Sequence, residues 1–143
     1  MLGKYSILVE NAYIRYEFEI TSSITVIRGQ SATGKTTLIE MIHEYNEQED
    51  TGIRVQCEKP LTVLYGRDWM NRLINISGSI VFIDEQSRFV KSVEFAEAIK
   101  GSDNYYVIVT REKLSDTYYN FSIYPSLNSS CAILSICLAL SFD

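Results

Sequence analysis

The chain has few of the residues that metal sites, disulfide frameworks and nucleic-acid surfaces need. Its three cysteines, Cys57, Cys131 and Cys137, form no CxxC pair and have no histidine nearby. An odd number of cysteines without metal spacing is typical of reduced thiols in a cytosolic protein. Lysine and arginine number 13 against 18 acidic residues, and the net charge is −5. This charge argues against broad nucleic-acid binding, which needs clustered basic residues.

Long apolar segments are also missing. The first residues, Met1 to Tyr5, lead into an alternating segment and not into the apolar core of a signal peptide. The most apolar stretch, residues 131–140, contains Ser135 and is too short to span a bilayer. We therefore expect a cytoplasmic protein with no membrane span. With 46% hydrophobic residues in 143, the chain can still bury a core, most simply as one domain.

Apolar periodicity predicts a three-layer α/β fold. Residues 4–10 and 12–20 alternate in polarity around Glu10-Asn11, which indicates an antiparallel hairpin with a tight turn. Further strand-like runs lie at residues 24–27, 53–57, 61–65, 80–83 and 105–109. Helical spacing is present at residues 35–45, 67–76 and 89–100. Because strands alternate with helices after residue 24, we expect a mainly parallel sheet.

These patterns divide the single predicted domain, residues 1–143, into three parts. The hairpin occupies residues 1–23 and the core residues 24–112. Residues 113–143 form a tail of uncertain structure, whose apolar part, from Ser130 to Leu140, fits a strand or a helix equally well.

The strongest motif follows the strand-like run that ends before residue 29. It matches G-x-x-x-x-G-K-[ST] in full and lies between a β run and a helical run, as a phosphate-binding loop requires. Its residues are Gly29, Gln30, Ser31, Ala32, Thr33, Gly34, Lys35 and Thr36. The glycines permit backbone angles that turn successive N–H groups toward phosphates, and the following helix adds its positive end. We expect Lys35 to reach the β- and γ-phosphates, Thr36 to bind Mg²⁺ and Thr37 to contact the α-phosphate.

A second motif is the apolar run of residues 80–83, which ends in Asp84 and Glu85. At such a strand end, Asp84 fits a holder of Mg²⁺, and Glu85 fits a general base that activates water. The alternative is that both acids simply begin a loop and helix, where negative charge is favourable. Downstream of a complete phosphate-binding loop, we favour the metal and base roles.

With these two motifs the chain resembles the P-loop NTPases that carry an additional catalytic glutamate, a branch that includes ABC, SMC-type and AAA+ ATPases. The resemblance covers residues 24–112 and implies that the strand at 105–109 lies between the strands of the two motifs. It also implies that Thr110 senses the γ-phosphate or the attacking water and that Arg111 lies beside it.

Several features of that branch are missing from the chain. No LSGGQ-like signature or lid insertion is present. The D-x-x-G and N-K-x-D motifs of regulatory GTPases do not occur either, which disfavours GTP as the ligand. Other arginines that could supply charge at the transition state are Arg67, Arg72 and Arg88. Trp69 or the Tyr105-Tyr106 pair could stack on a base, although core packing is the commoner role of such aromatics.

The sequence therefore predicts a MgATP-binding protein, with ATP and Mg²⁺ as its ligands. We expect slow ATP hydrolysis that is coupled to a protein partner or to a homo-oligomer. Two alternatives remain open at this point. One is a small-molecule or nucleotide kinase, and the other is a switch or scaffold that binds ATP without hydrolysing it.

Overall fold

The computed structural model describes residues 3–28, 35–84, 87–110 and 131–135, and it describes Arg28, Lys35, Thr36, Thr110 and residues 131–135 by their backbone only. The strands are β1 (Tyr5–Glu10), β2 (Arg15–Ile20), β3 (Ile24–Arg28), β4 (Arg54–Gln56), β5 (Leu61–Val63), β6 (Ile80–Asp84), β7 (Tyr105–Thr110) and β8 (Cys131–Ser135). The helices are α1 (Lys35–Glu47), α2 (Trp69–Ile74), the 3₁₀ helix η2 (Arg88–Lys91) and α3 (Val93–Ile99). The expected mixture of strands and helices is confirmed.

The first two strands form the predicted antiparallel hairpin. Its register runs from Tyr5 opposite Ile20 to Glu10 opposite Arg15. The turn is longer than the expected Glu10-Asn11, because strand pairing ends at Glu10 and Arg15 and leaves residues 11–14 between them. Within this turn the Asn11 carboxamide oxygen accepts hydrogen bonds from the backbone N–H groups of Tyr13 and Ile14 at 2.8 and 2.9 Å. The asparagine side chain thus takes the place of a backbone turn partner.

Strand β4 extends this antiparallel sheet, whose order is β2-β1-β4. The strand-like run at residues 53–57, which we place with the mainly parallel sheet because it follows residue 24, therefore joins the antiparallel sheet instead, as β4. The physical reason is burial. A parallel strand is covered on both faces, whereas in β4 Arg54 and Gln56 are exposed and only Val55 is half-buried.

The second sheet has five strands in the order β5-β6-β7-β3-β8, and every neighbouring pair is parallel. Strand β7 lies between β3 and β6, which is the position expected for residues 105–109. Residues 131–135, which fitted a strand or a helix in the sequence, form β8 beside β3. The sheet is therefore continuous from β5 at one edge to β8 at the other.

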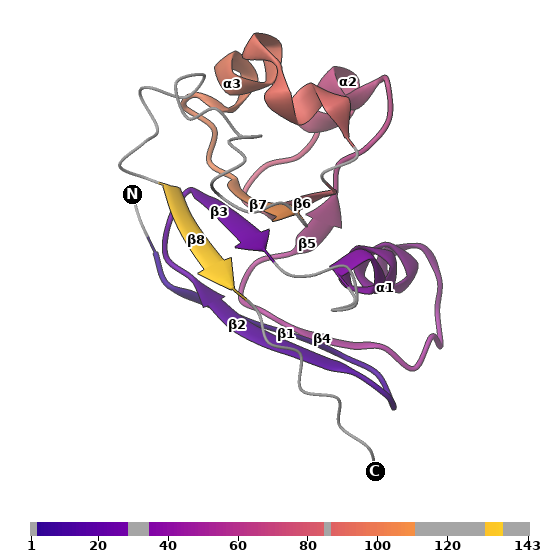
Figure 1. Ribbon diagram of the computed structural model, residues 1–143. Coiled ribbons are helices and arrows are strands. Elements are labelled where there is room, and N and C mark those ends of the chain that lie inside the picture. The colour runs from indigo at the N-terminus through magenta and orange to yellow at the C-terminus, as the bar shows by residue number, and fades with distance from the viewer. Residues whose placement is uncertain (1–2, 29–34, 85–86, 111–130, 136–143) are drawn as a thin grey trace.

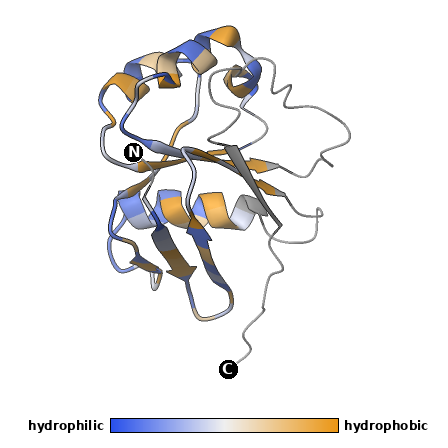
Figure 2. Ribbon diagram, turned by 90° about the vertical axis from the view of Figure 1, so that its left-hand side faces the viewer, coloured by the Kyte–Doolittle hydropathy of each residue, from blue (hydrophilic) through white to orange (hydrophobic). Residues whose placement is uncertain are grey.

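Helix α1 lies between the two sheets, and α2 and α3 cover the opposite face of the parallel sheet (Figure 1). The α/β class is confirmed, but the antiparallel sheet lies beyond α1 and adds a layer to the three that the sequence predicts. Two apolar clusters fill the spaces, one on each side of the parallel sheet, whose apolar strands are orange in Figure 2. Side chains alternate between them: Phe82 and Val107 pack toward α1, whereas Val81 and Ile108 pack toward α3.

Two helices are shorter than their periodicity predicts. The pattern at residues 89–100 is interrupted at Ser92, where η2 ends and α3 begins, because the Ser92 hydroxyl oxygen accepts a hydrogen bond from the Phe95 N–H at 3.1 Å. This serine is an N-cap. Helix α2 begins at Trp69 and not at residue 67, and the preceding Gly66 has a φ of +90°, outside the helical region.

Candidate functional site

The predicted site residues gather at the carboxyl edge of the parallel sheet. Strands β3, β6 and β7 end there at Arg28, Asp84 and Thr110. Arg28 pairs with Thr110, and Asp84 pairs with Val109, so these strand ends are direct neighbours. Strand β3 ends at Arg28 and α1 begins at Lys35, and residues 29–34 between them lie outside the described residues. The expected strand before the motif and the expected helix after it are confirmed.

Much of the predicted constellation lies outside the described residues. This holds for the loop residues Gly29, Gln30, Ser31, Ala32, Thr33 and Gly34, for Glu85 and for Arg111. Lys35 and Thr36 are placed in the first turn of α1, and Thr110 at the end of β7, by their backbone alone. The described part of the site is thus a frame of three strand ends and one helix start.

Thr37 is held by a residue that sequence reasoning missed. Tyr16 on β2 is 2% exposed, and its phenol forms a hydrogen bond with the Thr37 side chain in the first turn of α1. Burial raises the pKa of Tyr16 to about 12; the Thr37 hydrogen bond opposes this change, and the Glu40 carboxylate adds to it. The antiparallel sheet therefore contacts the helix turn that follows the predicted phosphate-binding motif. In the sequence, Tyr16 is one of the alternating residues of a strand, with nothing to mark this contact.

Substituting Tyr16 with phenylalanine is expected to lower the free energy of unfolding at neutral pH by about 1 kcal/mol, the usual net value of one hydrogen bond. It should also reduce the loss of unfolding free energy that accompanies a rise in pH above 10. Because the folded-state pKa lies above the ordinary value of 10, neutral Tyr16 stabilises the fold below pH 10, and this contribution is lost as pH rises toward 12. Urea unfolding at pH 8 and at about pH 11 measures both effects.

Tyr13→Phe is the matched control, because Tyr13 lies in the hairpin turn and is 78% exposed. This substitution should leave both the free energy of unfolding at neutral pH and its loss at alkaline pH as they are in wild type. If wild type, Tyr13→Phe and Tyr16→Phe lose stability equally between the two pH values, the raised pKa of a buried Tyr16 is contradicted. Equal stability of wild type and Tyr16→Phe at pH 8 would contradict the contribution of the hydrogen bond between Tyr16 and Thr37.

The expected Mg²⁺ ligands lie on two of the framing elements, with Thr36 in the first turn of α1 and the half-buried Asp84 at the end of β6. Hydroxyl and carboxylate oxygens fit the preference of Mg²⁺ for oxygen ligands, and phosphates and water usually complete its coordination. In the part of the chain that is described, no group of three or more His, Cys, Asp or Glu side chains could hold a metal on its own.

Of the other sequence candidates, some are engaged in contacts within the fold and others line a hollow at this edge of the sheet. Tyr105 and Tyr106 are buried and belong to the two clusters on opposite faces of the sheet, so core packing accounts for them. Arg72 bonds Asp68 at 3.0 Å and lies over the Tyr65 ring at 4.5 Å. Arg67 and Arg88, by contrast, line a hollow of about 570 Å³ that Asp84 also borders.

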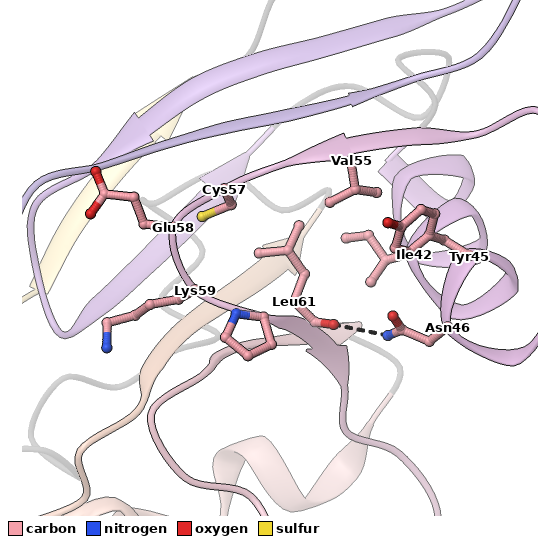
Figure 3. A pocket seen from close by; sticks show the side chains of 9 residues that line it. Ile42, Tyr45, Asn46, Val55, Cys57, Glu58, Lys59 and Leu61 are labelled. Atoms are coloured by element: carbon pink, nitrogen blue, oxygen red, sulfur yellow. Dashed lines mark hydrogen bonds between the residues drawn. The ribbon is translucent and has the colours of Figure 1, made fainter.

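A second, smaller cavity of about 240 Å³ lies away from this edge. It is bordered by Ile42 and Tyr45 from the second half of α1, by Val55 of β4 and by Leu61 at the start of β5 (Figure 3). The Asn46 side-chain amide donates to the Leu61 carbonyl across one side of it at 2.8 Å. The phosphate-binding motif lies at the other end of α1, so this cavity is not part of the candidate site.

No protein-family model and no curated protein matches the chain. None of the helices within the described ranges combines the length and apolar character that crossing a bilayer requires. The functional proposal therefore rests on the sequence motifs and on the edge of the sheet where they meet.

Proposed function

We propose that the chain binds MgATP at the carboxyl edge of the parallel sheet and hydrolyses it slowly, as a small cytoplasmic ATPase of P-loop NTPase type. The observation that carries the proposal is the joining of a complete G-x-x-x-x-G-K-[ST] motif to the end of β3 and the start of α1. In open α/β sheets, ligands bind outside the carboxyl ends of the strands, and a helix start attracts phosphate.

The strand order supports the same proposal. In the branch that the sequence resembles, one strand separates those of the two motifs, and β7 lies in that position between β3 and β6. This order brings the ends of β6 and β7 to the edge from which the loop leaves. Asp84, Glu85, Thr110 and Arg111 are then close in sequence to that edge.

The proposed chemistry assigns one role to each residue. Lys35 and the loop N–H groups bind the β- and γ-phosphates, and Thr36 and Asp84 hold Mg²⁺, which neutralises phosphate charge. Glu85 accepts a proton from water while the water oxygen attacks the γ-phosphorus, and the bond to the bridging oxygen breaks to give ADP and phosphate. Thr110 orients the water or the γ-phosphate, and Arg111 adds positive charge.

Slow turnover and a partner belong to the proposal because the sequence has no LSGGQ-like signature and no lid insertion. A P-loop core of this kind gains its missing groups from outside, as when an arginine is supplied in trans. A protein partner or a second copy of the chain would provide them.

Binding of MgATP, measured by isothermal titration calorimetry, tests the first step. Lys35→Ala removes a charged hydrogen-bond donor, a loss of about 1.5–3 kcal/mol, so the Kd is expected to rise about 10- to 100-fold. Lys100→Ala is the control, because Lys100 is exposed beyond α3 and pairs only with Glu97 among the residues described. Equal affinity of the two variants, or no saturable heat with wild type, contradicts the proposal.

A further inference from the structure

The hollow beside Asp84 lies between the two loops that follow neighbouring parallel strands. One side is Gly66, Arg67 and Trp69, which follow β5, and the other is Ser87, Arg88 and Phe89, which follow β6. Its volume of about 570 Å³ falls within the range of roughly 300–1,000 Å³ typical of small-molecule sites. It also lies at the carboxyl edge of the sheet, where ligands of open α/β sheets bind.

The apolar wall of this hollow is built by aromatic packing. The rings of Trp69 and Phe89 stack with centroids 5.0 Å apart and planes 14° from parallel. Phe95 of α3 packs edge-on against both, at 5.7 and 5.5 Å. These contacts fix the two loops relative to each other, so the hollow exists without a ligand and needs little ordering on binding.

Its charged groups favour an anion. Neither Arg67 nor Arg88 forms an ion pair with any residue within the described ranges, and Asp68, the acid next to Arg67, is engaged by Arg72 at 3.0 Å. Among the described residues that line the hollow, the two guanidinium groups and the one carboxylate of Asp84 sum to a formal charge of +1, in a chain of net charge −5. A local positive hollow on an acidic protein attracts small anions selectively.

We propose that this hollow binds a small organic oxyanion, a phosphate monoester or a carboxylate, that carries an apolar or planar group. The oxyanion accepts hydrogen bonds from Arg67 and Arg88, whose planar forks match phosphate and carboxylate oxygens. The apolar part packs against Phe89 and the rim of Trp69.

This site lies beside the proposed nucleotide site, shares only Asp84 with it among the described residues, and does not depend on nucleotide binding. The phosphate-binding loop leaves β3, which is separated from β6 by β7. Two strand spacings amount to about 10 Å. The two ligands would therefore be neighbours along one edge of the sheet, with Asp84 at the boundary between them.

The single tryptophan of the chain makes the test direct, because Trp69 lines this hollow. We expect phenyl phosphate or benzoate to change the fluorescence of Trp69 along a saturable curve, and neutral benzyl alcohol to produce no such curve. The tighter of the two anions identifies the oxyanion. Arg67→Gln and Arg88→Gln should each weaken binding about tenfold or more, because each removes a charge-assisted hydrogen bond.

Two further variants locate the bound probe. Arg54→Gln, which alters an exposed arginine of β4, and Lys35→Ala, which alters the phosphate-binding motif, should both leave the affinity unchanged. Loss of binding in Lys35→Ala would place the probe in the nucleotide site and overturn the proposal. So would a wild-type titration with no saturable change up to about 10 mM, ten times a millimolar Kd. Failure of MgATP to bind would leave these titrations unaffected, so the two proposals fail separately.

Discussion

Replacing Glu85 with glutamine is expected to slow ATP hydrolysis by a factor of about 10²–10⁴, the usual contribution of a positioned general base. The amide has nearly the shape of the carboxylate but cannot accept the proton of the attacking water. Binding should persist, because the groups proposed to hold the phosphates and Mg²⁺ are Lys35, Thr36 and Asp84. The variant should therefore combine a low kcat with a Kd for MgATP close to that of wild type.

Two measurements on the same preparation separate these effects: phosphate release at saturating MgATP and calorimetric binding. Glu94→Gln is the matched control, since Glu94 is exposed in the first turn of α3 and should change neither value. Equal phosphate release by wild type, Lys35→Ala and Glu85→Gln would reject the hydrolase. Tight binding without turnover in wild type, even with a partner added, would favour the non-hydrolysing switch.

The parts of the fold that were predicted from sequence have local or strongly patterned signals. Residues 80–83 are continuously apolar, and in β6 they are fully buried on both faces. The hairpin follows from period-two alternation, and the start of α1 follows from the end of the phosphate-binding motif. The position of β7 between β3 and β6 came from the resemblance and not from local pattern. It is nevertheless confirmed by the register of Ile24 with Tyr106 and of Ile80 with Tyr105.

The features that were missed depend on contacts between distant segments. Strand β4 pairs with β1 although more than forty residues separate them in the sequence, as in Leu8 opposite Gln56. A strand of only three residues has too short a pattern to indicate which sheet it joins. The hydrogen bond between Tyr16 and Thr37 joins two elements that the sequence separates by β3 and a loop. Gly29 to Gly34, Glu85 and Arg111 lie outside the described residues, so their roles stay predictions.

Phe95→Ala is expected to lower the free energy of unfolding by about 3–5 kcal/mol, the usual cost of truncating a buried phenylalanine. Phe95 is fully buried, and its ring packs against those of Trp69, Phe89 and Tyr106. It therefore joins α3 both to the parallel sheet and to the wall of the hollow beside Asp84. Its removal leaves a cavity among three other aromatic rings, which cannot collapse without moving the sheet or the two loops. Urea unfolding followed by circular dichroism and by Trp69 fluorescence measures the loss.

Val93→Ala is the control on the same helix, because Val93 is 62% exposed and should change the free energy of unfolding by no more than about 0.5 kcal/mol. Phe95→Leu retains most of the buried volume and should fall between the two, which keeps the series readable if the alanine variant does not fold. The fluorescence of Trp69 should differ from wild type in both Phe95 variants, since Trp69 loses an edge contact at 5.7 Å. A loss below about 1 kcal/mol for Phe95→Ala would contradict the packing of α3 on the sheet. It would also contradict the rigid aromatic wall on which the proposed anion site depends, even if ATP binding at the neighbouring site on the same edge were intact.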